Sequence, residues 1–281
     1  MRVLWHDVGR GYPPNTYLYG LRGERIPRTF AVNSEKVIFV AEEAFSNREI
    51  MHKLGKYKGS ERMCDLVGAN YPMLLVMSRF GIALGFGDKT IAEVCADSGV
   101  DERVFLAIVN LLLGEEGEPV EVDPALDPGA VVEYLQNSHA YFLDFRLPAI
   151  RRKLIEAIDC GQSDLSFAIL RFFDQYVDEV RRHMHYEDQT VFPYVRSLAG
   201  GHPDCYNIDI FRRRHDSVEA RLTELKNILI KYYPARGSNE LNSVLFDIFT
   251  CAEDLASHNR IEDSLLVPLV ARLEREREGR R

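Results

Sequence analysis

The most informative stretch of the chain is "HMHYEDQTVFPYV" at residues 183–195, because much of it recurs as "HNRIEDSLLVPLV" at residues 258–270. The two stretches carry His, Glu, Asp, Pro and Val at the same positions. Such a repeat has two explanations. It is either a pair of helix ends with similar sequences, or two halves of one site that takes a histidine and a carboxylate from each half.

The residues around each stretch follow the period of an amphipathic α-helix. His183 and Glu187 interrupt an apolar stripe that runs from Leu165 to Tyr194, and His258 and Glu262 interrupt a second stripe, between 244 and 269. Two further stripes contain His139 and His215. Each of four helices is therefore predicted to carry one inward-facing histidine.

Four periodic segments are predicted as long helices, at about 130–158, 163–198, 207–234 and 238–277. The sequences "CGQS", "AGGHPDC" and "PARGS" separate them, and all three have the composition of turns. Four amphipathic helices with short connections predict an all-α, up-down-up-down four-helix bundle spanning 130–277. Its inward stripes meet in one interior.

Two inward glutamates call for a common partner, because Glu is almost never fully buried unless it is paired or bound to metal. A His and a Glu at i and i+4 project from one face about 5.4 Å apart along the helix. Imidazoles and carboxylates together suit iron, manganese or zinc better than calcium or magnesium. We therefore predict a centre of two iron ions, with manganese or zinc as possible substitutes. Its predicted ligands are His139, His183, Glu187, His215, His258 and Glu262.

In the alternative interpretation, His183 and His258 face solvent and the acids form ordinary exposed pairs. That would require the apolar stripes to be misphased on both helices. His185 is expected on the surface and His202 in a loop. Asp188 and Asp263 are expected to flank the site or to form hydrogen bonds outward, and the shared Asp and Pro are interpreted as scaffold.

Upstream of the bundle, the stretch "GEEGEPVEVDPALDPG" at 114–129 predicts a domain boundary. We expect a small helical N-terminal domain at 35–115, with Asp101 as a helix N-cap, and an irregular extension at 1–34. Residues 90–113 have the outline of a helix-turn-helix. The second helix begins "DERVFLAIVNLLLG", with two acids and one arginine before a run of apolar residues, which is the wrong chemistry for a recognition helix; two packed helices are the favoured interpretation.

The composition limits the possible partners. The net charge of −8 argues against a partner held by phosphate contacts, so no nucleic acid is expected. No apolar run is long enough to span a bilayer, and no membrane partner is expected. Five scattered cysteines without CxxC spacing fit a reducing, cytoplasmic location.

At the predicted His and Glu ligands, the chain resembles the hemerythrin-like, HHE cation-binding proteins, and among them the repair-of-iron-centres di-iron family. The resemblance lies in "SHAYFLDFRLPAI" for His139, "HMHYED" for His183 and Glu187, "RHDSVEARL" for His215 and "HNRIED" for His258 and Glu262. It implies that the two glutamates bridge the metal ions. The stretch "MSRFGIALGFGDKTIAEVCADSGVD" is similar to the small domain that precedes the bundle in that family.

Two departures from the family pattern affect the expected chemistry. Gly85 and Phe86 stand where the family usually has a pair of cysteines. The family commonly supplies a fifth histidine near the position of Cys160 and Gly161, where this chain has none. Either one iron keeps an open or water-filled position or another residue substitutes, and Glu219, one turn after His215, is the candidate. Its alternative is an exposed partner for a neighbouring Arg or Lys.

The resemblance implies a non-haem di-iron protein for iron–sulfur cluster repair, or for the response to nitrosative or oxidative stress. Its partners would be a small diatomic ligand, O₂ or NO, and an iron–sulfur protein client. The alternative is a di-iron sensor of O₂, NO or iron, in which the N-terminal helices pass the signal to a partner. An oxidase or peroxidase would need a substrate pocket and proton donors that the sequence does not identify.

Overall fold

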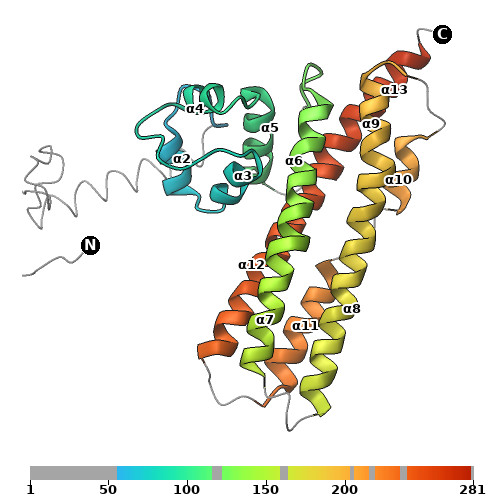
Figure 1. Ribbon diagram of the computed structural model, residues 1–281. Coiled ribbons are helices and arrows are strands. Elements are labelled where there is room, and N and C mark those ends of the chain that lie inside the picture. The colour runs from blue at the N-terminus through green and yellow to red at the C-terminus, as the bar shows by residue number, and fades with distance from the viewer. Residues whose placement is uncertain are drawn as a thin grey trace, which may run out of the picture. The chain divides into compact units, whose positions relative to one another are not determined.

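The computed structural model describes residues 56–115, 122–158, 164–202, 206–214, 219–234 and 239–279, the side chains of 214, 219 and 220 excepted (Figure 1). These residues form helices, turns and loops, and no β-strand occurs among them. They belong to one compact unit, Lys56–Arg281. The predicted extension 1–34 and residues 35–55 of the predicted small domain lie outside the described residues.

Four short helices precede the bundle: α2 (Met63–Ala69), α3 (Met73–Arg79), α4 (Ile91–Asp97) and α5 (Glu102–Leu113). Thr90 and Glu93 form a reciprocal capping box at the start of α4. The Asp101 carboxylate accepts hydrogen bonds from the backbone N–H groups of Arg103 and Val104, which confirms Asp101 as the N-cap of α5.

The loop after α3 contains the first departure from the family pattern. Gly85 has a φ of +99° and Gly87 has a φ of +64°. These angles lie in the left-handed region that glycine adopts without the steric cost of a Cβ atom. A cysteine at position 85 would be strained in this backbone, so the loop conformation agrees with the absence of a thiol there.

The bundle consists of four antiparallel helical segments in up-down-up-down order, which confirms the predicted fold class (Figure 1). Segment ends agree with the predicted ones to within two residues. The segments are α6–η2–α7 (Pro128–Ala140, Tyr141–Arg146, Leu147–Ala157), α8–η3–α9 (Asp164–Tyr186, Glu187–Val191, Phe192–Ala199), α10 and α11 (Ile208–Arg214, Glu219–Tyr232), and α12–η4–α13 (Asn239–Ile261, Glu262–Leu266, Val267–Glu278). Helices α7, α8, α11 and α12 each contact the next around a closed ring.

Three of these segments contain a π-helical stretch, labelled η, that the sequence pattern did not predict. Each stretch ends just before a helix whose second residue is proline: Pro148, Pro193 or Pro268. Proline has no N–H to donate, and its ring clashes with the carbonyl four residues earlier, which here lies inside the π-helical stretch. The proline shared by the two repeated stretches thus lies two residues after the end of a π-helical stretch.

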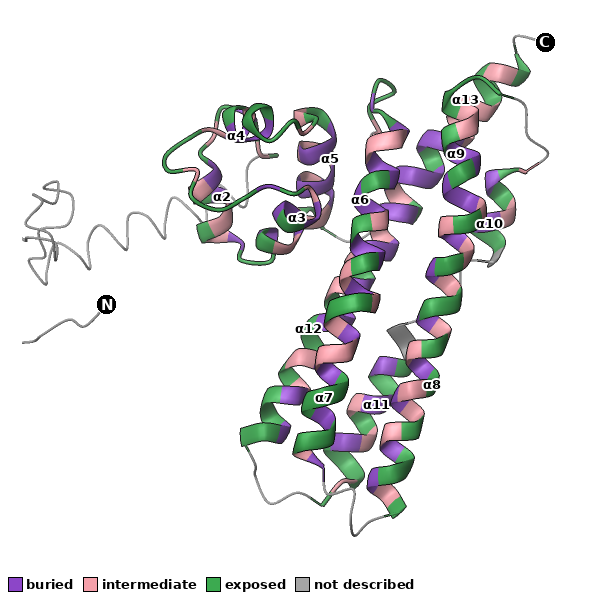
Figure 2. Ribbon diagram, in the orientation of Figure 1, coloured by how far each residue is buried: buried purple, intermediate pink, exposed green. Residues whose placement is uncertain are grey.

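The hydrophobic core extends from the short helices into the bundle. Val104, Phe105 and Ile108 of α5 belong to the same buried cluster as Val131 and Leu135 of α6. A second buried cluster fills the other half of the bundle, between α7, α8, α11 and α12. Figure 2 shows the buried residues as stripes along the helices. One apolar core is therefore shared by the predicted small domain and the predicted bundle.

Within the described ranges, no helix is both long and apolar enough to cross a membrane.

Candidate metal centre

Four predicted ligands meet in the interior of the bundle: His139, Glu187, His258 and Glu262. Each offers one nitrogen or oxygen atom, and these atoms all lie within 4.8 Å of one another. The exposed fraction is 2% for His139, 1% for His258 and zero for both glutamates. His139 and His258 project from α6 and α12, and the glutamates are the first residues of η3 and η4. The two repeated stretches therefore contribute to one site.

His183 lies beside this cluster, one turn before Glu187 on α8. Its Nε2 is 3.0 Å from Glu187 Oε1, and its side chain is 14% exposed. The other oxygen, Glu187 Oε2, is 3.2 Å from Nε2 of His139. The two oxygens of one carboxylate thus face imidazoles from two different helices. In the second repeat, His258 Nε2 is 3.2 Å from Glu262 Oε1.

The remaining predicted positions are placed as follows. His215 and the Cys160–Gly161 region lie outside the described residues. Glu219 is the first residue of α11, and its side chain is not among those described. His185 and His202 are exposed, as predicted.

The polar atoms of the cluster fit a metal ion. Among the described residues, no hydrogen-bond partner exists for the buried His139 Nε2, for either ring nitrogen of His258, or for either oxygen of Glu187. Buried polar atoms are nearly always hydrogen-bonded or bound to metal, because desolvating them without a partner is costly. Imidazole and carboxylate donors together match iron, manganese or zinc.

Asp188 orients His139 from the neighbouring helical segment. Its Oδ1 is 3.1 Å from His139 Nδ1, and it also accepts a hydrogen bond from Gln136 Nε2 at 3.4 Å. Arg196 in turn donates to Gln136 Oε1 at 2.6 Å. A carboxylate that binds the outer ring nitrogen of a histidine leaves the other nitrogen free to ligate a metal. Asp188 therefore flanks the site, as predicted, whereas Asp263 is exposed.

The cluster shifts the pKa of His139 without metal. Burial lowers that pKa, but the hydrogen bond to Asp188, the Glu187 carboxylate 3.2 Å from Nε2 and the charge of Glu262 together outweigh burial and raise it to about 9. Burial is the largest single influence on Asp188 and raises its pKa, but the hydrogen bond to His139, the charge of His139 and the hydrogen bond from Gln136 together outweigh burial and lower that pKa overall. In metal-free protein at neutral pH, the His139 ring is therefore in its protonated, positively charged form.

Aromatic rings enclose the histidines. Phe192 stacks on His139 with ring centroids 5.3 Å apart, and the rings of His139 and His258 are 5.1 Å apart. Phe142 meets His258 edge to face at 6.0 Å. These contacts keep water from the imidazoles. They join residues of different helices, which helical periodicity alone does not pair.

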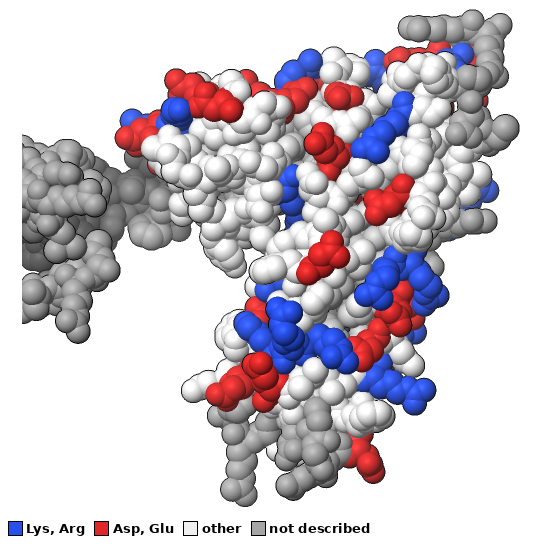
Figure 3. Space-filling view, viewed as in Figure 1, with Lys and Arg blue, Asp and Glu red and all other residues white. Residues whose placement is uncertain are grey.

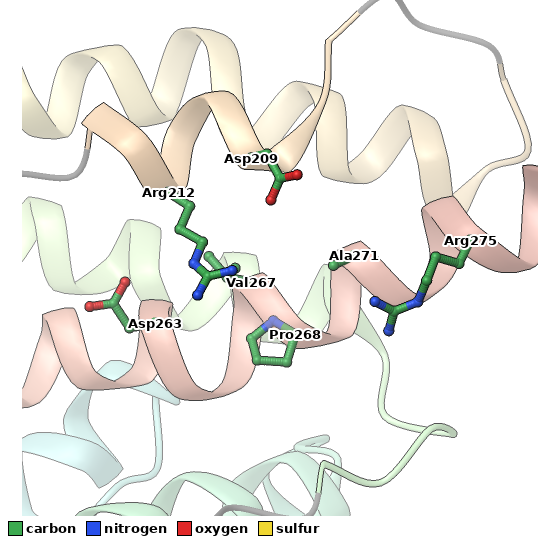
Figure 4. A pocket seen from close by; sticks show the side chains of 7 residues that line it. All are labelled: Asp209, Arg212, Asp263, Val267, Pro268, Ala271 and Arg275. Carbon is green, nitrogen blue, oxygen red and sulfur yellow. The ribbon is translucent and has the colours of Figure 1, made fainter. Parts of the chain in front are cut away.

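A surface pocket of about 550 Å³ lies elsewhere, between α10 and α13 (Figure 4). None of the candidate ligands lines it, so it takes no part in the metal centre. Its lining residues are Asp209, Arg212, Asp263, Val267, Pro268, Ala271 and Arg275.

Charged side chains of both signs alternate on the face shown in Figure 3. Arg151 pairs with Asp174 at 2.7 Å, and Lys153 pairs with Asp247 at 2.6 Å. In both of these pairs the basic group already has an acidic partner.

The fold and the cluster define a helical-bundle protein with a buried His/Glu set that can hold a metal ion. The family model of the hemerythrin HHE cation binding domain matches residues 130–270, which is half of the chain. The chain belongs to this family. Comparison with the curated proteins found no similar sequence.

Proposed function

We propose that this protein binds two iron ions in the interior of its bundle. The observation that carries the proposal is the position of Glu187, whose two oxygens face His183 on one side and His139 on the other. A carboxylate whose two oxygens face histidines from two different helices can bridge two ions. His258 and Glu262 complete the His139 side, and His215 is the proposed further ligand.

The chain's own residues hold the donors in place. Asp188 fixes the ring of His139, and Phe142 and Phe192 shield the histidines from water. Bound iron would supply redox chemistry and affinity for a small diatomic ligand such as O₂ or NO.

Anaerobic loading with Fe(II), followed by removal of excess metal and elemental analysis, tests the proposal. Wild-type protein should retain about two irons per chain. Glu187→Gln keeps the shape of the side chain but removes the charge and one oxygen donor, so it should retain one iron or fewer. Glu179→Gln is the control, because Glu179 lies earlier in the same helical segment, pairs with Arg221 at 3.0 Å and is not one of the clustered residues. Full iron content in Glu187→Gln, or none in wild type, would contradict the proposal.

For the physiological role, we propose iron–sulfur cluster repair or a response to nitrosative or oxidative stress. The support is the resemblance of the His and Glu motifs to the repair-of-iron-centres family, together with membership of the hemerythrin HHE family. The cysteines whose surroundings are described, Cys64, Cys95 and Cys251, are free thiols, which agrees with a reducing cytoplasm.

A second candidate is a sensor of O₂, NO or iron. It is supported by the φ of +99° at Gly85, where the family usually has a cysteine, and by the apolar core that α5 and α6 share. A repair assay on a damaged iron–sulfur enzyme separates the two roles. Recovery of that enzyme supports repair, and ligand-dependent association with a partner without recovery supports sensing.

A further inference from the structure

Arg79, the last residue of α3, enters the bundle as a buried cation. Its side chain is 3% exposed, and its Nη2 is 2.6 Å from Asp254 Oδ2 on α12. Its guanidinium carbon lies 5.2 Å from the ring centroid of Tyr141 and 5.1 Å from that of Phe142. Arginine is rarely buried unless it is paired, so this charge depends on Asp254 and the aromatic rings.

The partners of Arg79 adjoin two candidate ligands. Asp254 lies one helical turn before His258 on α12. Phe142 lies three residues after His139 and packs edge to face against the His258 ring at 6.0 Å. Arg79 therefore connects the helix that carries His139 with the helix that carries His258.

A backbone contact reinforces this connection. Asn137, two residues before His139, donates through Nδ2 to the carbonyl oxygen of Arg79 at 2.8 Å. Helix α3 also packs against α6 (Figure 1). The end of α3 is thus held to α6 by its main chain and to α12 by its side chain.

We propose that Arg79 is a positioning residue for the metal centre, through which the short N-terminal helices control the geometry of His139 and His258. The proposal rests on the proposed iron-binding function. Its physical basis is that a paired guanidinium on one face of Phe142 holds the ring against His258, and that the Asp254 ion pair keeps α12 in register with α6. Groups that support metal ligands typically change metal affinity by about 10–100-fold when they are replaced.

Full-length Arg79→Met tests this, with Arg103→Met as the control. Arg103 also belongs to the short helices, but its ion pair with Asp123 at 2.6 Å is about half exposed. Competition with a coloured chelator should show Fe(II) binding at least about tenfold weaker in Arg79→Met and unchanged in Arg103→Met. Iron affinity within threefold of wild type in folded Arg79→Met would overturn the proposal.

A second variant covers the case in which the unpaired Asp254 prevents folding. Arg79→Met with Asp254→Leu removes both charges, and apolar replacement of a buried ion pair is often neutral or stabilising. We expect this double variant to keep its helical circular dichroism and still bind iron at least about tenfold more weakly. Wild-type affinity in the folded double variant would also overturn the proposal.

The ring signals of the histidines give a readout that needs no iron. In metal-free protein, nuclear magnetic resonance of ¹⁵N-labelled histidine should show shifted His139 and His258 signals in Arg79→Met, but not in Arg103→Met. A purely structural role would lower the unfolding temperature and leave these signals unchanged in the folded state. If wild type bound no iron, the proposed function would fail, and the ring signals would still decide whether Arg79 positions the histidines.

Discussion

Metal-free protein should lose stability as the pH rises from 6.5 to 9.5, and Asp188→Asn should remove much of that loss. The pKa of His139 is about 9 in the folded protein, whereas the ordinary value for a histidine, which applies to the unfolded chain, is 6.5. Between these values the folded state binds a proton that the unfolded state has released. The free energy of unfolding therefore falls with rising pH in this window.

The magnitude follows from the difference between the two pKa values. At about 1.4 kcal/mol for each pKa unit, the difference amounts to roughly 3 kcal/mol, an upper value for the pH-dependent stability from this one group. Asparagine at 188 keeps an oxygen that can accept from His139 Nδ1 but removes the negative charge. The pKa of His139 should then fall, and the stability gained below pH 6.5 should shrink with it.

Urea unfolding with a chelator present, measured at pH 6.5 and 9.5, checks this expectation. Asp174→Asn serves as the control, because it removes a carboxylate whose pair with Arg151 is exposed, and its pH dependence should match wild type. If Asp188→Asn lost as much stability as wild type between the two pH values, the assigned role of Asp188 would be wrong. A flat profile in wild type would refute the raised pKa of His139 itself.

Three further predictions concern metal uptake and packing. Zn²⁺ should bind more tightly as the pH rises from 6.5 to 9, because it must displace a proton from His139. Calorimetry in buffers of different ionisation enthalpy should detect the released proton, and binding without proton release would contradict this prediction. Phe142→Ala should lower the free energy of unfolding by about 3–5 kcal/mol in urea titrations, while Phe145→Ala, at a 61% exposed position, should change it little. Thr90→Ala removes the capping box of α4 and should cost about 1 kcal/mol in the same assay; a cost near zero would show that the cap adds nothing to global stability.

Much of the fold could be predicted from the sequence because helical periodicity is local. The apolar stripes of the four segments predicted the helix ends to within two residues, and four of the ligands predicted from them, His139, Glu187, His258 and Glu262, lie together in the interior. A buried Glu one turn after a buried His is itself a signal, since an ionised carboxylate in a core needs a partner. The predicted ligand roles themselves await measurement.

The contacts between helices could not be predicted, since they depend on how the segments pack. No spacing rule pairs Asp188 with His139, or Arg79 with Asp254, which are 175 residues apart. The π-helical stretches also escaped prediction, although Pro148, Pro193 and Pro268 were visible signals for a disturbed turn.

The sequence by itself determined which residues line each helix, because side-chain direction follows from the 3.6-residue period alone. Only the tertiary structure decided which of those residues meet. Packing sets the two oxygens of Glu187 between His139 and His183, and it brings Arg79 from a separate group of helices to the wall of the site. These distances are properties of the assembled bundle, because they depend on the relative depth and rotation of whole helices, which no single segment encodes.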